Sequence, residues 1–229
     1  MTPRLTAAID RRLVLKSLAA LPLAAALPRP AAAQGAAATL VAVADLHSPY
    51  ARLPALLAEL RAIRAEAPGP VALLINGDAF ERGNVVATRG GAVADWAFLR
   101  AAAAEMPVVL NLGNHETAIE DDMATTVARA RAAGVEVIGN LIDRRTGRFF
   151  APVSTRLGLR GIDVALLGIG TDNPFVYRQP ARDTLTLLDP VAFAGDAVAD
   201  ATAGADLPVL ASHAGVAADK AILPGLPEG

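Results

Sequence analysis

Six polar residues follow apolar runs in this 229-residue chain, and they include all three of its histidines. They are Asp45 and His47 after VAVA, Asp78 after LLING, Asn114 and His115 after NLG, and His213 after VLAS. Carboxylate, amide and imidazole groups without thiolates suit divalent ions such as manganese, iron or zinc. A carboxylate can bridge two such ions, and a bridged pair can bind and deprotonate water at neutral pH. The residue types therefore indicate a metal site with hydrolytic chemistry.

Each motif alone also has an ordinary structural interpretation. Asp45 could belong to a turn that caps a helix, and the Asn-Gly pair before Asp78 could form a tight hairpin turn. Asn114 could be a left-handed turn residue, and His213 could be a solvated imidazole beside a helix cap. These alternatives stay open for each motif singly. Four separate runs that each end in a potential ligand favour one shared site.

Short apolar runs alternate with helical stretches along the chain, and this pattern is typical of βαβ units around a buried sheet. It predicts the strands and helices that must position these residues. The expected strands cover residues 39–44, 71–75, 107–111, 135–139, 162–169 and 207–211. The expected helices cover residues 53–65, 92–105 and 123–133, and a further helix runs from Pro190 toward Ala203 with Asp189 as N-cap. Ligands gather at the carboxyl ends of strands in such sheets. The glycine-rich loop 77–91 is expected to be mobile and close to any site.

The first 33 residues read as a targeting segment and not as part of the fold. Arg11 and Arg12 open the stretch DRRLVLK, the apolar stretch 18–27 follows, and a small-residue cleavage site ends at Ala33. This pattern resembles a bacterial twin-arginine export signal. The alternative, a membrane anchor, is disfavoured because the apolar run is shorter than the roughly 20 residues that span a bilayer. We expect a signal peptide at 1–33, one domain at 34–229, passage through the twin-arginine export machinery, no stable membrane anchor after cleavage, and a periplasmic or otherwise exported location.

Composition excludes two classes of function. The chain has no cysteine, so it holds neither disulfides nor thiolate metal sites. Without residues 1–33 it keeps 16 basic and 22 acidic residues, a net charge of −6. A protein that binds the nucleic-acid backbone needs the opposite sign, so we expect no nucleic-acid partner. The segment GIGTDNP lacks the full dinucleotide fingerprint, which disfavours a nucleotide cofactor.

Four motifs, ADLH, NGDAFERG, LGNHE and SHAG, resemble the successive blocks of the calcineurin-like metallophosphoesterases. The best match is to the exported branch of 5′-nucleotidases, cyclic phosphodiesterases and UDP-sugar hydrolases. The resemblance runs from Thr39 to the end of the chain, and GNHE and GD are its most specific parts. It implies an α/β fold, a four-layer αββα sandwich, and a metal-dependent hydrolase that acts on nucleotides or related small-molecule phosphoesters.

The resemblance also implies a role for each of the six polar residues. The implied ligands are Asp45 and His47 for the first divalent ion, Asp78 for both ions, and Asn114 and His213 for the second. His115 would lie beside the leaving-group oxygen, as proton donor or as stabiliser of the developing charge. A hydroxide that bridges the two ions would attack phosphorus in line.

The sequence departs from the family pattern at three places. The family continues after SHAG with a Gly-His-x-His block that supplies one ligand to each ion, whereas this sequence reads LPGLPEG there, so we expect a catalytic domain that is incomplete at its C-terminus. The separate substrate domain of the nucleotidase branch is not expected in this sequence either. The branch often pairs its catalytic histidine with an aspartate three residues on, where this chain has Ala118. Glu116, Asp121 or Asp122 could substitute, but solvated acidic residues at a helix start are the favoured interpretation. The alternative function is a catalytically incomplete exported module that binds a metal or phosphate.

Overall fold

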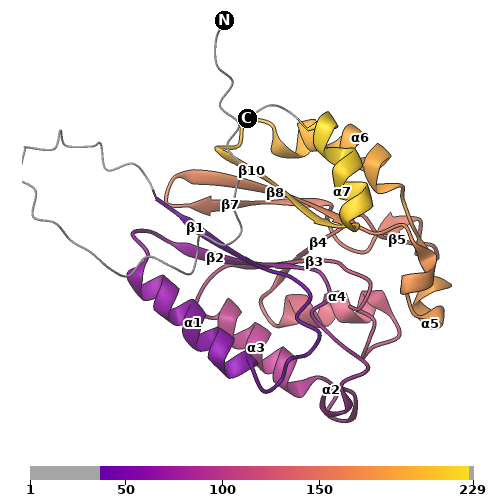
Figure 1. The fold of residues 1–229 in the computed structure, drawn as a ribbon, viewed down its shortest axis with the longest axis horizontal. Helices are drawn as coiled ribbons and strands as arrows, with labels where there is room; N and C mark the ends of the chain where they lie inside the picture. Colours follow the sequence, from indigo (N-terminus) through magenta and orange to yellow (C-terminus); the bar gives the residue numbers. More distant parts are fainter. Residues whose placement is uncertain (1–36, 227–229) are drawn as a thin grey trace, which may run out of the picture. The chain divides into compact units, whose positions relative to one another are not determined.

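The computed structural model describes residues 37–226. In this part of the chain two large β-sheets stack on each other, and helices cover the outer side of each sheet (Figure 1). The first sheet is parallel and has the order β1-β2-β3-β4. Its strands are β1 (Thr39–Val43), β2 (Val71–Asn76), β3 (Val108–Asn111) and β4 (Glu136–Ile138). The predicted export signal lies outside the described residues. Within residues 37–226, no helix is both long and apolar enough to cross a bilayer.

The second sheet has the order β10-β8-β7, with β10 parallel and β7 antiparallel to β8. Its strands are β7 (Ser154–Leu159), β8 (Ile162–Gly170) and β10 (Leu207–His213). A small antiparallel sheet contains β5 (Ile142–Asp143), β6 (Arg148–Phe149) and β9 (Leu185–Thr186).

Helices cover the outer faces of the two large sheets. The first sheet is covered by α1 (Leu53–Glu66), α3 (Val93–Ala103) and α4 (Met123–Ala132). The second is covered by α6 (Pro190–Thr202) and α7 (Val216–Ile222). The remaining helical segments are α2 (Val85–Arg89), α5 (Gln179–Arg182) and two 3-10 turns at Pro174–Val176 and Leu223–Gly225. The order of layers is helix, sheet, sheet, helix, as the expected αββα sandwich requires.

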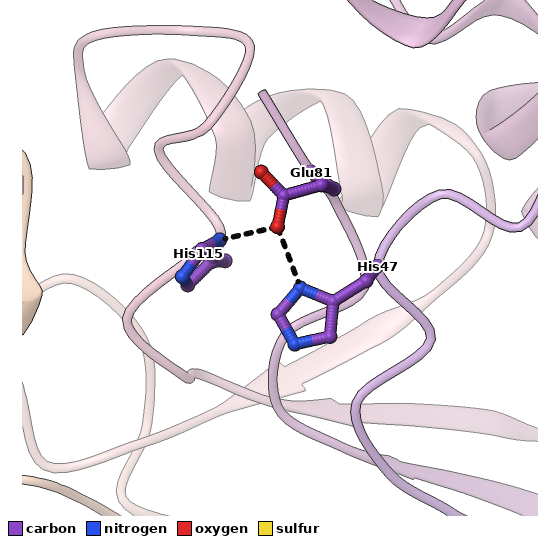
Figure 2. A group of neighbouring side chains, drawn as sticks. All are labelled: His47, Glu81 and His115. Atoms are coloured by element: carbon purple, nitrogen blue, oxygen red, sulfur yellow. Dashed lines mark hydrogen bonds and ion pairs between the residues drawn. The ribbon is translucent and has the colours of Figure 1, made fainter. Parts of the chain in front are cut away.

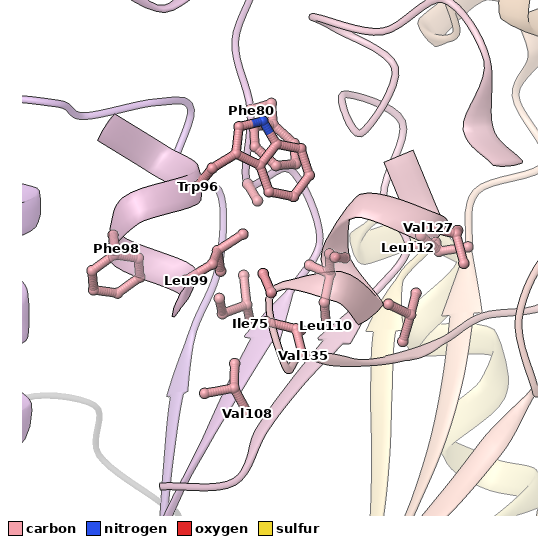
Figure 3. Close-up of a cluster of buried hydrophobic side chains, with 14 of the residues drawn as sticks. Ile75, Phe80, Trp96, Phe98, Leu99, Val108, Leu110, Leu112, Val127 and Val135 are labelled. Carbon is pink, nitrogen blue, oxygen red and sulfur yellow. The ribbon is translucent and has the colours of Figure 1, made fainter. Parts of the chain in front are cut away.

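Three apolar clusters fill the three interfaces between these layers, because neighbouring side chains of a strand point to opposite faces. On β2, Leu73 and Ile75 face the helices, and Leu74 faces the second sheet. The cluster beneath α3 and α4 includes Trp96 and Leu110 (Figure 3). Strands buried on both faces read as continuous apolar runs, which is why the sequence reveals them.

The side chain of Asn111, at the end of β3, links the two large sheets by hydrogen bonds. Its buried amide nitrogen donates to the Asn76 side chain at 2.9 Å and to the carbonyl oxygens of Ala211 at 2.8 Å and Ile169 at 3.2 Å. These acceptors belong to β2, β10 and β8, so one side chain sets the spacing of strand ends from both sheets. Gly168 makes room for it, because a Cβ there would lie 2.5 Å from Asn111 Oδ1.

The structure agrees with the predicted large strands and helices to within a few residues. Asp189 caps α6 as predicted, because its carboxylate accepts from the backbone N–H groups of Val191 and Ala192 at 2.9 and 2.8 Å. The prediction of one loop across residues 77–91 was wrong, because α2 interrupts it. Asn84 starts that helix by accepting from the N–H groups of Val86 and Ala87.

Candidate metal centre

The carboxyl ends of β1, β2, β3 and β10 bring the six predicted residues to one edge of the sandwich. His213 Nε2 lies 3.3 Å from Asp78 Oδ2. His47 Nε2 lies 3.7 Å from Asp78 Oδ2 and 3.7 Å from Asp45 Oδ1. The carboxylate of Asp78 therefore faces one imidazole from each of two chain segments that are far apart in sequence. One carboxylate thus has potential ligand partners in both sheets.

Both of these imidazoles are held so that Nε2 faces the carboxylates. His47 Nδ1 lies 3.0 Å from Glu81 Oε2, and His213 Nδ1 lies 2.9 Å from the carbonyl oxygen of Asn76. These acceptors place the proton on Nδ1 and leave Nε2 unprotonated in the neutral ring. A histidine that donates its second nitrogen to a carboxylate or carbonyl is oriented as a metal-ligating histidine is.

Asp78 is the buried member of the centre, with a side chain 5% exposed. Its Oδ1 accepts from the backbone N–H of His115 at 2.7 Å. Burial opposes ionisation of Asp78, but hydrogen bonds and positive charge from His213 and His115 hold its pKa below the usual value. Burial lowers the pKa of His213, but Asp78 raises it to about 9. In the metal-free protein a proton on His213 thus balances the charge of Asp78.

Glu116 holds the two loops that carry Asp78 and His115. It is 1% exposed and accepts from the backbone N–H groups of Gly113 at 2.7 Å, Ala79 at 2.9 Å and Asp78 at 3.3 Å. Burial and the charge of Asp78 raise the pKa of Glu116 to about 7. The prediction that Glu116 is a solvated residue was therefore wrong, because the sharp turn of LGNHE folds its side chain under both loops.

Glu81 is a residue of the centre that the sequence prediction missed. Its Oε2 lies 3.0 Å from His47 Nδ1 and 3.3 Å from His115 Nδ1, so that it joins the two rings (Figure 2). The two imidazoles also meet edge to face, with ring centroids 4.7 Å apart. Glu81 therefore supplies His115 with a carboxylate neighbour, and it comes from the loop after β2. The motif NGDAFERG placed Glu81 three residues beyond Asp78, and this spacing was the available signal.

The other acidic residues near His115 have different partners. Asp121 pairs with Arg178. Asp122 caps α4 through the backbone N–H of Thr125 at 3.2 Å and pairs with Arg145 at 2.9 Å. These contacts leave Glu81 as the carboxylate that the structure places beside His115.

Asn114 lines an open cleft of about 450 Å³ together with Asp45 and His213. Its side-chain nitrogen donates to the carbonyl oxygen of Val176 at 3.4 Å, which leaves the amide oxygen available to a ligand. All six predicted residues thus border one region at the strand ends.

The backbone of the centre is strained. Asp45, His47, Ser48 and Asp78 have left-handed φ angles of 53°, 50°, 50° and 54°. Such angles cost on the order of 1 kcal/mol or more per residue and cluster at functional sites. A hydrogen bond outside the β1–β2 pairing stabilises this backbone conformation. The N–H of His47 donates to the carbonyl oxygen of Asp78 at 2.9 Å.

The donor set fits a divalent ion. Asp45, His47 and Asp78 form one group, and His47, Glu81 and His115 form another, each with ligand atoms within 4.8 Å of one another. The 3.7 Å separations in the first group are too long for hydrogen bonds, and ligands about 2.0–2.2 Å from an ion stand roughly 3–3.5 Å apart. Small side-chain movements would therefore close this group around an ion.

Comparison with known proteins supports this interpretation of the centre. The sequence profile described as Calcineurin-like phosphoesterase matches residues 38–171. No curated protein matches the chain significantly. Among solved structures, the NAD nucleotidase of Haemophilus influenzae superposes with a TM-score of 0.65 at 21% identity, over 80% of this chain and 35% of that one.

Two further solved structures share the fold. The 5′-nucleotidase precursor of Thermus thermophilus has a TM-score of 0.61 at 24% identity and covers 79% of this chain and 38% of its own. A putative 5′-nucleotidase of Staphylococcus aureus has a TM-score of 0.61 at 16% identity, over 78% and 38%. The chain thus spans little more than a third of the length of these structures.

Proposed function

Because the chain belongs to the calcineurin-like phosphoesterase family, we propose that it hydrolyses nucleotides or related small phosphoesters with two divalent metal ions. The observation that carries this proposal is the position of Asp78 between His47 and His213, with 3.7 and 3.3 Å between the facing atoms. Asp45 and His47 would hold one ion, and Asn114 and His213 the other. Asp78 would contact both. The fold of the similar nucleotidases supports the nucleotide part of the proposal.

Each residue of the centre has a task in such a reaction. Divalent ions would supply positive charge to the phosphoryl oxygens and lower the pKa of bound water. The backbone N–H of His115 donates to Asp78, and this hydrogen bond holds the turn that carries His115. Glu81 orients the imidazole ring of His115 through its Nδ1. The ring of His115 would then donate a proton to the leaving oxygen or stabilise its charge.

The proposal extends to location and processing. Residues 1–33 would direct export through the twin-arginine machinery to the periplasm, and residues 34–229 would carry the catalytic domain. The mass of the protein isolated from its own cells tests this, because cleavage after Ala33 leaves an N-terminus at Gln34.

The function is tested by stripping metal from the purified protein with a chelator and restoring Mn²⁺, Zn²⁺ or Fe²⁺ separately. We expect hydrolysis of p-nitrophenyl phosphate and nucleoside monophosphates to disappear with the metal and to return with at least one ion. Asp78→Asn should lower this activity by more than about 100-fold, because even residues that only support metal ligands contribute about 10- to 100-fold. Asp163→Asn is the matched control, since Asp163 is a half-exposed residue that pairs with Arg156 near the start of β8, away from the centre.

Two results would contradict the proposal. Activity that survives complete metal removal would exclude the metal-dependent reaction. Metal binding by calorimetry without hydrolysis of any phosphoester would favour the binding-only module instead.

A further inference from the structure

The cleft beside the metal centre is lined by both polar and apolar side chains. Asp45, Asn114 and His213 are among them, and the proposed ions and phosphoryl group would lie beside these three. Val176 and Val216 line the same cleft and come from a 3-10 turn and from the start of α7. A ligand in this cleft can therefore contact both kinds of side chain.

Charge in this cleft sets a limit on the ligand. Among the described residues, no lysine or arginine lines the cleft, and Asp219 adds a second carboxylate to that of Asp45. The Ser212 hydroxyl donates to Asp219 at 2.6 Å, which holds this carboxylate close to the cleft. With His213 bound to an ion, and therefore neutral, an anionic group on the ligand beyond the phosphoryl group would meet no lysine or arginine side chain in the lining of the cleft.

The apolar residues at the cleft are unusually exposed. Val216 is 70% exposed and Val176 is 41% exposed. Exposed apolar side chains that line one cleft mark a binding surface more often than scattered ones do.

Hydrogen bonds fix this turn to the metal centre. Asn114 donates to the carbonyl oxygen of Val176 at 3.4 Å, and Asn173 accepts from the backbone N–H of Phe175 at 3.0 Å. The buried Tyr177 hydroxyl donates to the carbonyl oxygen of Thr171 at 2.9 Å. The turn is thus held on both sides, which lowers the entropy cost of binding a ligand against it.

We propose that Val176 and Val216 form a subsite for an uncharged apolar or aromatic organic group of a phosphate monoester. The inference deepens the proposed function and rests on it for the position of the phosphoryl group. The subsite selects against ligands that carry a further anion, because the lining of the cleft offers Asp45 and Asp219 and contains no lysine or arginine.

The test measures binding to the Mn²⁺-loaded full chain by calorimetry, with three phosphonates that cannot be hydrolysed. Phenylphosphonate is the reference, 1-naphthylphosphonate adds apolar surface, and 4-phosphonobenzoate adds an anion. We expect the naphthyl compound to bind about 5- to 10-fold more tightly than phenylphosphonate, and the benzoate to bind more weakly. Val216→Ala should reduce the naphthyl-to-phenyl ratio roughly three-fold.

Val93→Ala is the matched control, because Val93 is the first residue of α3, as Val216 is of α7, and is 65% exposed. It should leave the ratio unchanged. Equal affinity for the phenyl and naphthyl compounds, no binding of either, or tighter binding of the benzoate would overturn the subsite. Hydrolysis of phenyl and 1-naphthyl phosphates, followed in parallel, reports on the proposed function separately. Hydrolysis without preference would refute the subsite alone, and ordered phosphonate binding without hydrolysis would refute the hydrolase alone.

Discussion

Adding one methyl group at Gly77 should lower the metal affinity of the centre as well as the stability of the fold. Its φ is +77°, and a Cβ there would lie 2.3 Å from His213 Nδ1. Gly77→Ala must therefore move the ring that Asn76 orients through its carbonyl oxygen at 2.9 Å. The neighbouring carboxylate of Asp78 would lose its imidazole partner as a result.

The expected magnitude has two parts. A left-handed alanine costs about 1–2 kcal/mol of folding stability, and the lost hydrogen bond of His213 costs about 1 kcal/mol more. For a domain of this size, 1 kcal/mol lowers Tm by about 2–4 °C. Metal affinity should fall about 10- to 100-fold, because the supporting contact of a ligand is broken.

Gly91→Ala is the matched control, because Gly91 has φ +59° and no atom within 4 Å of an added Cβ. Gly91→Ala should lose folding stability because of its left-handed alanine, and it should leave metal affinity unchanged. Thermal unfolding and calorimetric Mn²⁺ titration of both variants supply the comparison. Equal metal affinity in Gly77→Ala and Gly91→Ala would refute the idea that the Gly77 contact orients His213 for an ion.

Three further predictions concern residues around the centre. Glu81→Gln should weaken Mn²⁺ binding about 10-fold in a calorimetric titration, because the charge that orients His47 is lost, whereas Glu59→Gln on the exposed face of α1 should not. Arg145→Ala should leave hydrolysis unchanged, because Arg145 contacts none of the six predicted residues, but should lower Tm by about 2–4 °C or more, because the buried carboxylate of Asp143 loses both of its hydrogen bonds to the guanidinium; a large loss of activity or an unchanged Tm would contradict this. The raised pKa of His213, about 9, should make metal-free protein lose stability relative to His213→Gln as pH rises from about 6.5 through 9, since the proton that pairs with Asp78 is lost there. Denaturation curves across this pH range that run parallel for the two proteins would exclude that ion pair as a source of stability.

The large strands and helices could be predicted because their signals are local. Strand β2 is buried on both faces and reads as an uninterrupted apolar run, and α6 begins with the Asp-Pro signal of a capped helix. Strand β7 was missed because its exposed residues, Arg156 among them, interrupt the apolar pattern. Helix α7 was missed because its short stretch carries little periodic signal.

Contacts within the centre depend on the folded chain and were only partly predictable. The six ligand-type residues could be found because each lies at the end of an apolar run or within a few residues after it. Glu81 was missed because it meets His47 across 34 residues of sequence and belongs to a loop without periodicity. Glu116 was misjudged because its burial is created by three backbone donors from two loops, which no sequence pattern specifies.

The contact between Asp78 and His213 has a consequence for the order of folding. Asp78 follows β2 in the first sheet, and His213 ends β10 in the second, so the centre is complete only when β10 has docked. An ion held by both residues would close a long loop of the chain and act as a reversible crosslink between the sheets. Metal uptake would then be a late kinetic step, and its rate would report the docking of β10 onto a preformed first sheet.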